Sequence, residues 1–131
     1  MKLYLCRHAA AAPGDPDELR ELTPAGVVQA YTLGRLLAET EAPPTVVVSS
    51  PLVRAKQTAE AVCRETRAEL RVDERLAPGA GVEELRAILE DLGGPVATVG
   101  HQPDCSNIVV ALIGTDPGFP PAGVAAIEVG S

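Results

Sequence analysis

The sequence predicts an α/β fold, a three-layer sandwich in which a mainly parallel central sheet is flanked by helices. Apolar runs at residues 3–6, 45–48 and 96–99 lack polar alternation, which indicates strands buried on both faces of a sheet. Segments with helical periodicity separate these runs, as expected for strand–helix–strand units. At 131 residues we expect one domain, residues 1–131, large enough to bury a core.

The first part of the chain predicts a strand, a loop and a helix. The strand at residues 3–6 ends abruptly at Arg7-His8, and residues 13–21 are rich in Asp, Glu, Pro and Gly, as in surface loops. Thr23-Pro24 is typical of a helix start, because threonine is a good N-cap and proline suits the first helical position. The helical pattern that follows predicts a helix reaching about Glu39.

The second part repeats this order. After the buried strand at residues 45–48, Ser49-Ser50-Pro51 has the same pattern of a capping residue followed by proline. We therefore expect a helix that begins at this point and reaches about Arg67. Residues 70–72 alternate between apolar and polar character, which predicts a shorter strand at the edge of the sheet.

The last part predicts a turn, two helices and two strands. The turn covers residues 78–81, and a helix at 82–92 follows it. The buried strand at 96–99 leads to a helix at about 103–113, and a final strand is expected at about 123–129. The apolar residues that we expect on one face of the first of these helices are Leu85, Ile88, Leu89 and Leu92.

Composition limits the classes of partner and compartment. A net charge of −7 argues against a broad nucleic-acid surface, although a few arginines could still hold a small anion. Cys6, Cys63 and Cys105 are odd in number and lack the spacing of a disulfide framework, so we expect free thiols in a reducing cytoplasm. Arg7 interrupts the N-terminal apolar run, and no run approaches the roughly 18 apolar residues of a membrane span. We therefore expect a cytoplasmic protein with no nucleic-acid or membrane partner.

Polar residues that can do chemistry follow three of the predicted strands. Arg7 and His8 follow the first, Ser50 leads to Arg54 after the second, and His101 follows the strand at 96–99. The carboxyl ends of parallel strands meet at one edge of a sheet, so these groups are expected to converge there. A lone histidine at a strand end is commonly structural, whereas two histidines and two arginines together favour a functional site.

Such a group suits phosphoryl transfer. The guanidinium forks of Arg7 and Arg54 match phosphate oxygens, and a helix starting at Ser50-Pro51 would present free N–H groups to an anion. Neighbouring positive charges lower a histidine pKa, which leaves His8 neutral and nucleophilic. His101 could donate a hydrogen bond to a phosphoryl oxygen as charge develops there. The residues therefore predict a covalent phosphohistidine intermediate.

Four segments resemble the histidine phosphatase superfamily, which includes the phosphoglycerate mutases. Arg7-His8-Ala9 is similar to its Arg-His-Gly signature, and residues 22–26 resemble its Leu-Thr-x-x-Gly segment. Residues 50–58 resemble its Ser-Pro-x-x-Arg-Ala-x-Gln-Thr motif, and Gly100-His101 is similar to the segment of its second histidine. The order of the motifs is that of the family, and the short chain is most similar to the SixA-type phosphohistidine phosphatases. The resemblance implies a phosphoglycerate mutase-like fold.

The resemblance also implies roles for four residues. His8 would be the nucleophile, Arg7 and Arg54 would clamp the phosphoryl group, and His101 would complete the pocket. The partner would be a phosphohistidine protein or a small phosphorylated substrate. We expect no metal or other cofactor, because the two arginines supply the charge that Mg²⁺ supplies in other phosphoryl-transfer sites.

The chain departs from the family pattern at two places. Many members carry a glutamate general acid in a Leu-x-Glu context, where this chain has Pro78, which cannot transfer protons. The Asn or Ser that often follows the first motif is replaced by alanine throughout residues 9–12. Acids that could substitute, although each is expected on the surface, are Glu83, Glu84, Asp104 and Asp15.

Three alternatives to a phosphohistidine phosphatase remain open at this point. Cys6, His8, His101 and Cys105 could form a tetrahedral zinc site, but Arg7 and Arg54 would then place positive charge beside the cation. A catalytically silent phosphate- or phosphopeptide-binding module could share the fold, although binding alone would need only the arginines. A small-metabolite phosphatase or mutase of the same superfamily is the closest enzymatic alternative.

Overall fold

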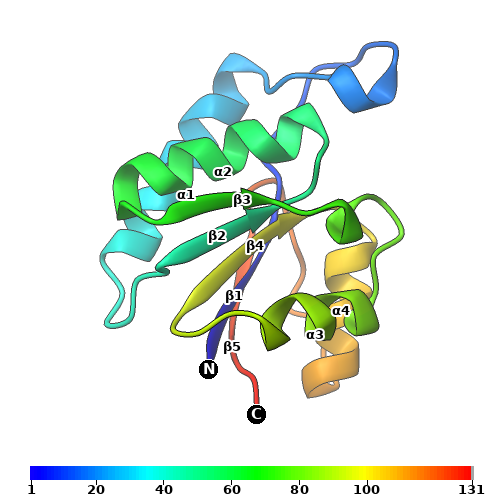
Figure 1. Ribbon diagram of the computed structural model, residues 1–131. Coiled ribbons are helices and arrows are strands. Elements are labelled where there is room, and N and C mark those ends of the chain that lie inside the picture. The colour runs from blue at the N-terminus through cyan, green and yellow to red at the C-terminus, as the bar shows by residue number, and fades with distance from the viewer. Residues whose placement is uncertain (131) are drawn as a thin grey trace.

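The computed structural model describes residues 1–130 and is built around a five-stranded sheet with the order β3-β2-β4-β1-β5 (Figure 1). The pairs β1–β4, β2–β4 and β2–β3 are parallel, whereas β5 runs antiparallel to β1 at one edge. The strands are β1 (Lys2–Arg7), β2 (Val46–Ser49), β3 (Glu69–Val72), β4 (Val96–Gly100) and β5 (Val124–Glu128).

Helices cover both faces of this sheet (Figure 1). On one face lie α1 (Pro24–Ala38) and α2 (Val53–Thr66), and on the other lie α3 (Val82–Glu90) and α4 (Asp104–Ile113). The predicted three-layer α/β sandwich with a mainly parallel sheet is therefore confirmed. Within residues 1–130, no helix combines the length and the apolar character needed to cross a membrane.

Successive residues of β1 point into two different cores, because side chains alternate across a sheet. Leu3 and Leu5 pack with α3 and α4 residues in one apolar cluster, whereas Tyr4 and Cys6 join the cluster under α1 and α2. All four side chains are nearly inaccessible to solvent. The unbroken apolar run in the sequence thus reflects burial of this strand on both faces.

The three central strands end level with one another. In the parallel pairing Arg7 lies opposite Gly100, and Ser49 lies opposite Val99. The pairing continues one residue further, since the His8 N–H donates to the Gly100 carbonyl at 3.0 Å. Residues that follow these strands are consequently held at one edge of the sheet, as the sequence predicts.

The Leu-Thr-x-x-Gly segment fixes the loop after β1 against α1. Thr23 is the helix N-cap, as predicted, and its hydroxyl accepts from the Gly26 N–H at 2.9 Å. The Thr23 N–H donates in turn to the Ala10 carbonyl at 3.0 Å. A Cβ atom on Gly26 would collide with that same carbonyl group. Glycine is therefore required here by the close approach of two backbones.

The structure departs from the expected elements in four places. Helix α2 begins at Val53 with Leu52 as N-cap, two residues later than the predicted start at Ser50-Pro51. The Ser50 hydroxyl instead accepts from the Leu52 N–H and bonds to His101, so it is engaged in tertiary contacts. Helix α3 ends at Glu90 instead of Leu92. Two short 3₁₀ turns were not expected, η1 (Asp17–Leu19) and η2 (Glu74–Leu76).

Candidate active site

His8 follows β1 and is oriented by its neighbour. Its ring Nδ1 lies 2.7 Å from the Ala9 carbonyl oxygen, which can only accept, so Nδ1 carries the proton and Nε2 keeps a free lone pair. Burial lowers the pKa of His8 most, and the positive charges of Arg54, Arg7 and Arg20 lower it further, against the opposing effect of the Ala9 carbonyl. The His8 imidazole is therefore neutral at neutral pH, with Nε2 unprotonated.

His101 follows β4 and lies beside His8. The two ring centroids are 5.3 Å apart, and the His101 side chain is only 4% exposed. Its Nε2 lies 2.7 Å from the Ser50 hydroxyl oxygen. Burial, followed by repulsion from a protonated His8 and from Arg54, lowers the pKa of His101 to about 4, so this ring is neutral at neutral pH as well.

Arg54 reaches the site from the first turn of α2, and its side chain is almost fully buried. Its Nη1 donates to the Asp17 backbone carbonyl at 2.9 Å, and its Nη2 donates to the Asp17 carboxylate at 3.1 Å. Arg7 stands at the end of β1 and donates from Nη1 to the Phe119 carbonyl at 3.0 Å. Hydrogen bonds from terminal Nη atoms to other parts of the chain thus hold both guanidinium groups in place.

Three buried nitrogen atoms of these residues have no hydrogen-bond partner within residues 1–130. They are Arg7 Nε, Arg54 Nε and His101 Nδ1. A buried oxygen, Thr98 Oγ1, also has no partner within these residues. A buried donor without an acceptor costs stability, especially when its group is charged. Unused donors of two arginines and a histidine around His8 therefore fit a bound oxyanion.

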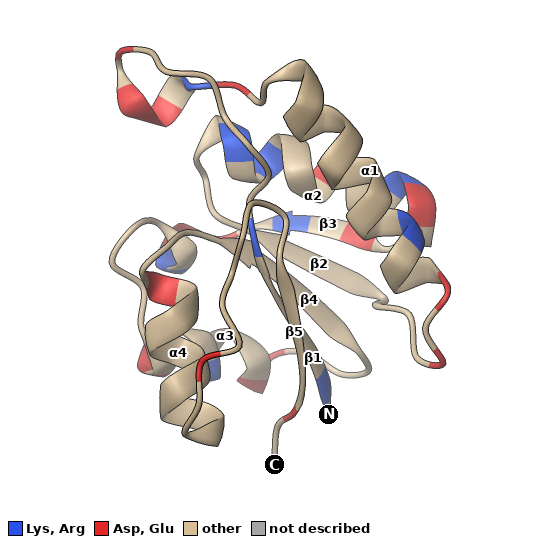
Figure 2. Cartoon of the chain, turned by 180° about the vertical axis from the view of Figure 1, so that it is seen from behind, with Lys and Arg blue, Asp and Glu red and all other residues tan. Residues whose placement is uncertain are grey.

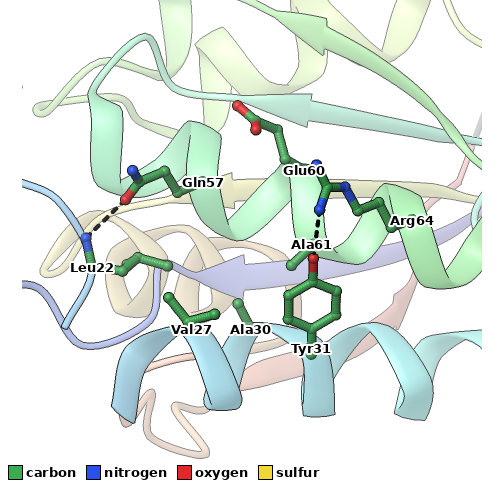
Figure 3. A pocket seen from close by; sticks show the side chains of 8 residues that line it. All are labelled: Leu22, Val27, Ala30, Tyr31, Gln57, Glu60, Ala61 and Arg64. Atoms are coloured by element: carbon green, nitrogen blue, oxygen red, sulfur yellow. Dashed lines mark hydrogen bonds between the residues drawn. The ribbon is translucent and has the colours of Figure 1, made fainter. Parts of the chain in front are cut away.

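Other residues of the Ser-Pro-x-x-Arg-Ala-x-Gln-Thr segment, residues 50–58, hold this site together. Thr58 Oγ1 accepts from the Ala9 N–H at 3.0 Å and donates to the Arg54 carbonyl at 2.8 Å. Gln57 accepts from the Leu22 N–H at 2.8 Å, at the edge of a groove between α1 and α2 (Figure 3). These contacts fasten both ends of the β1–α1 loop to α2, and so hold the residue after His8 against the helix that carries Arg54.

Asp17 is a site residue that the sequence analysis missed. It lies in η1, within the segment that we expected to be only a surface loop, and its side chain is 58% exposed. Its carboxylate pairs with Arg20 at 2.8 Å and with Arg54 at 3.1 Å, and these two bonds, in that order, lower the pKa of Asp17. Figure 2 shows this acidic turn standing away from the sheet, near the start of α2. The only signal in the sequence was the Asp-x-x-Arg spacing.

The four acids considered as proton donors are engaged elsewhere or exposed. Glu84 accepts from the Gly81 N–H at the start of α3, and Asp104 accepts from the Gly79 N–H, while bordering a small cavity next to His101. The residues not so bonded are Glu83, which is 80% exposed and faces Arg86, and Asp15, which is exposed. Among residues 1–130, none of the four bonds to either histidine or to the two arginines of the site.

The cysteines do not have the character of zinc ligands. Cys6 and Cys105 are buried, and their thiols donate to the backbone carbonyls of Tyr4 and Cys6. Burial raises the pKa of Cys6 far above its usual range and that of Cys105 to about 12, so neither is a thiolate. In the part of the chain that the structure describes, no three His, Cys, Asp or Glu side chains are arranged to hold a metal.

A sequence model of the histidine phosphatase superfamily (branch 1) matches residues 3–79 of this chain. The match covers more than half of the sequence and includes His8 and Arg54, whereas His101 lies beyond it. A search of curated proteins finds no significant match.

Three solved structures show how far the similarity extends. The protein histidine phosphatase SixA complexed with tungstate is 26% identical, with 98% of this chain and 88% of that chain covered and a TM-score of 0.87. A candidate phosphohistidine phosphatase SixA from Agrobacterium tumefaciens is 30% identical, with coverage of 95% and 89% and a TM-score of 0.82. A mycobacterial glucosyl-3-phosphoglycerate phosphatase is 18% identical, with coverage of 95% and 88% and a TM-score of 0.73, and shares the fold.

Proposed function

This chain belongs to the histidine phosphatase superfamily and is a phosphatase, and we propose that it removes phosphoryl groups from phosphohistidine through a covalent intermediate on His8. One observation carries the proposal. Within residues 1–130, buried donors of Arg7, Arg54 and His101 have no partner, and the ring of His101 lies 5.3 Å from that of His8, whose Nε2 lone pair is free. Donors can stabilise the charge on the phosphoryl oxygens, and a nucleophile can attack phosphorus.

The first step forms a bond between His8 Nε2 and phosphorus and breaks the bond from phosphorus to the leaving group. Arg7 and Arg54 hold the phosphoryl oxygens and offset their charge, and His101 donates to an oxygen as charge builds. In the second step water attacks phosphorus, the His8–phosphorus bond breaks, and phosphate leaves with His8 restored. The Ala9 carbonyl keeps the His8 ring oriented through both steps.

The choice of phosphohistidine as substrate rests on the leaving group. Among residues 1–130, none of the acids weighed as proton donors bonds to the two histidines or the two arginines of the site. The Asp17 carboxylate does bond to Arg54, but its lowered pKa makes it a poor acid at neutral pH. An alkoxide leaves slowly without protonation, whereas imidazole has a pKa of about 6.5 and departs readily. The SixA structures at 26% and 30% identity support the same substrate class.

A comparison of substrates tests the proposal. We would measure kcat/KM for a phosphohistidine peptide, an aryl phosphate and 3-phosphoglycerate, with His8→Ala as the matched inactive control. The expected order is phosphohistidine, then aryl phosphate, then 3-phosphoglycerate. A preference for the alkyl ester would place this protein with the small-metabolite phosphatases or mutases. Tight tungstate binding with no turnover of any substrate would identify a binding module.

A further inference from the structure

Ser50 has no catalytic role in the steps above, yet its side chain is fully buried and lies against His101. It follows the last residue of β2, and its N–H donates to the Val99 carbonyl at 3.0 Å, which fixes it next to β4. Its hydroxyl oxygen lies 3.2 Å from the Leu52 nitrogen and 2.7 Å from His101 Nε2. The sequence predicts this serine as a helix N-cap, whereas the N-cap of α2 is Leu52.

The direction of the bond between Ser50 and His101 follows from an accounting of hydrogens. A serine hydroxyl has one hydrogen to donate and two lone pairs to accept with. The Leu52 N–H occupies one lone pair, and His101 Nε2 is the acceptor within reach of the hydroxyl hydrogen among residues 1–130. A proton on Nε2 would leave that hydrogen unpaired in a fully buried position, which is unfavourable. The hydroxyl therefore donates to Nε2.

The proton of the neutral His101 ring must then lie on Nδ1. This nitrogen is buried and has no hydrogen-bond partner in the described chain. It belongs to a ring whose centroid is 5.3 Å from that of His8. An unused N–H donor thus lies next to the nucleophile, where it can bond to an oxygen of the transferred phosphoryl group.

We propose that Ser50 is a positioning residue that holds His101 in the tautomer with its proton on Nδ1, and so makes His101 a hydrogen-bond donor to the phosphoryl group. The inference rests on the proposed function, in which that group is transferred to His8. Without the hydroxyl, the proton can move to Nε2. The lone pair then left on Nδ1 would repel a phosphoryl oxygen instead of binding it.

Ser49 provides a matched control. It is also fully buried, it is adjacent in sequence, and its hydroxyl donates to the Ser50 carbonyl at 2.8 Å. Ser49→Ala therefore removes a buried hydroxyl from the same segment without removing a bond to His101. Ser50→Thr is the conservative variant, because it keeps a hydroxyl at the position.

The experiment reads the tautomer by NMR of the ¹⁵N-histidine-labelled protein without substrate, and kcat with an aryl phosphate. In the wild type, Nδ1 of His101 should show the chemical shift of a protonated nitrogen and Nε2 that of a bare one. Ser50→Ala should shift the proton toward Nε2 and lower kcat by roughly 10- to 100-fold, since one donor of a preorganised set is lost. Ser49→Ala and Ser50→Thr should keep the wild-type tautomer and most of the activity.

Two results would overturn the inference: a wild-type His101 protonated on Nε2, or a Ser50→Ala protein with the wild-type tautomer. The first result does not depend on whether the variant folds. Because the NMR measurement uses no substrate, it also separates the inference from the proposed function. Failure to trap a phosphoenzyme on His8, with the tautomer as expected, would overturn the proposed function and leave the link between Ser50 and His101 intact.

Discussion

The floor of the site, formed by His8, Ser50 and His101, is held differently from its rim, formed by η1 (Asp17–Leu19) and Arg20. Each floor residue follows a central strand, and backbone hydrogen bonds to a neighbouring strand fix His8 and Ser50. The rim has no buried residue in its 3₁₀ turn, and Arg54 of α2 holds it to the site by two bonds that it donates to Asp17.

This difference suggests separate roles, with the floor serving the chemical step and the rim serving the binding of substrate. Preorganised groups on a rigid sheet can stabilise a transition state, because they need no rearrangement during the reaction. An exposed turn held by an ion pair contributes little stability and is screened by salt. Substitutions in the floor should therefore change kcat, whereas those in the rim should change binding.

The largest effect is expected for His8→Ala. Turnover should fall by several orders of magnitude with the fold intact, because the covalent route is lost. Rapid quenching of the wild type with labelled substrate should trap an acid-labile, base-stable phosphoenzyme. Substantial activity in a folded His8→Ala protein, judged by circular dichroism, would remove His8 from the role of nucleophile.

Arg54 joins the two regions, and its loss should cost less than that of His8. Arg54→Ala should reduce kcat/KM by roughly 30- to 1,000-fold, or about 2–4 kcal/mol, as for other preorganised donors. Arg54→Lys should recover only part, because an ammonium cannot make two parallel bonds. Equal activity of the lysine variant and the wild type would show that only the charge matters.

The floor should also be visible in the pH dependence of stability. The pKa of His101 falls from about 6.5 in the unfolded chain to about 4 in the fold, so the unfolded state binds more protons between these values. Stability should therefore drop as pH falls through this window, by about 2 kcal/mol from this residue between pH 7.5 and 5.0. Urea unfolding at both pH values checks this.

The control is His101→Asn, whose loss of stability over the same pH interval should be smaller by that amount. His8, whose pKa is also lowered, contributes in the same direction and is retained in both proteins. An equal loss in the two proteins would mean that His101 titrates normally in the fold.

A smaller effect is expected at the rim. Asp17→Asn removes a negative charge next to the anion site, so tungstate should bind up to about fivefold more tightly at low salt, with kcat nearly unchanged. Glu18→Gln makes the same charge change in the same turn without removing a bond to Arg54 and should have less effect. Tenfold weaker tungstate binding in Asp17→Asn would instead mean that the carboxylate positions Arg54.

The smallest effect is expected for removal of metal ions. Because Arg7 and Arg54 supply the positive charge, EDTA should leave the rate nearly unchanged, whereas vanadate and phosphate should inhibit. The check is the rate after prolonged dialysis against chelator, followed by addition of zinc. Loss of activity that zinc restores would favour a metal site.

Expectations from the sequence succeeded where the signal is local. The run at residues 3–6 and the polar pair after it correctly identified the strand and its His8 end, because burial on both faces removes polar alternation. Thr23 was correctly assigned as an N-cap, since its contact reaches only three residues along the chain. The same reasoning failed for Ser50, whose hydroxyl bonds to His101 in the segment that follows β4.

The sequence by itself determined the order of the strands and helices along the chain and the family. It also determined the three strand ends at which His8, Ser50 and His101 stand. These depend on periodicity and on adjacency along the chain. The tertiary structure alone decided that Asp17 pairs with Arg54, 37 residues away, and that Ser50 bonds to His101, 51 residues away. Such contacts depend on the directions of side chains from separate segments, and those directions are set only when the segments pack together.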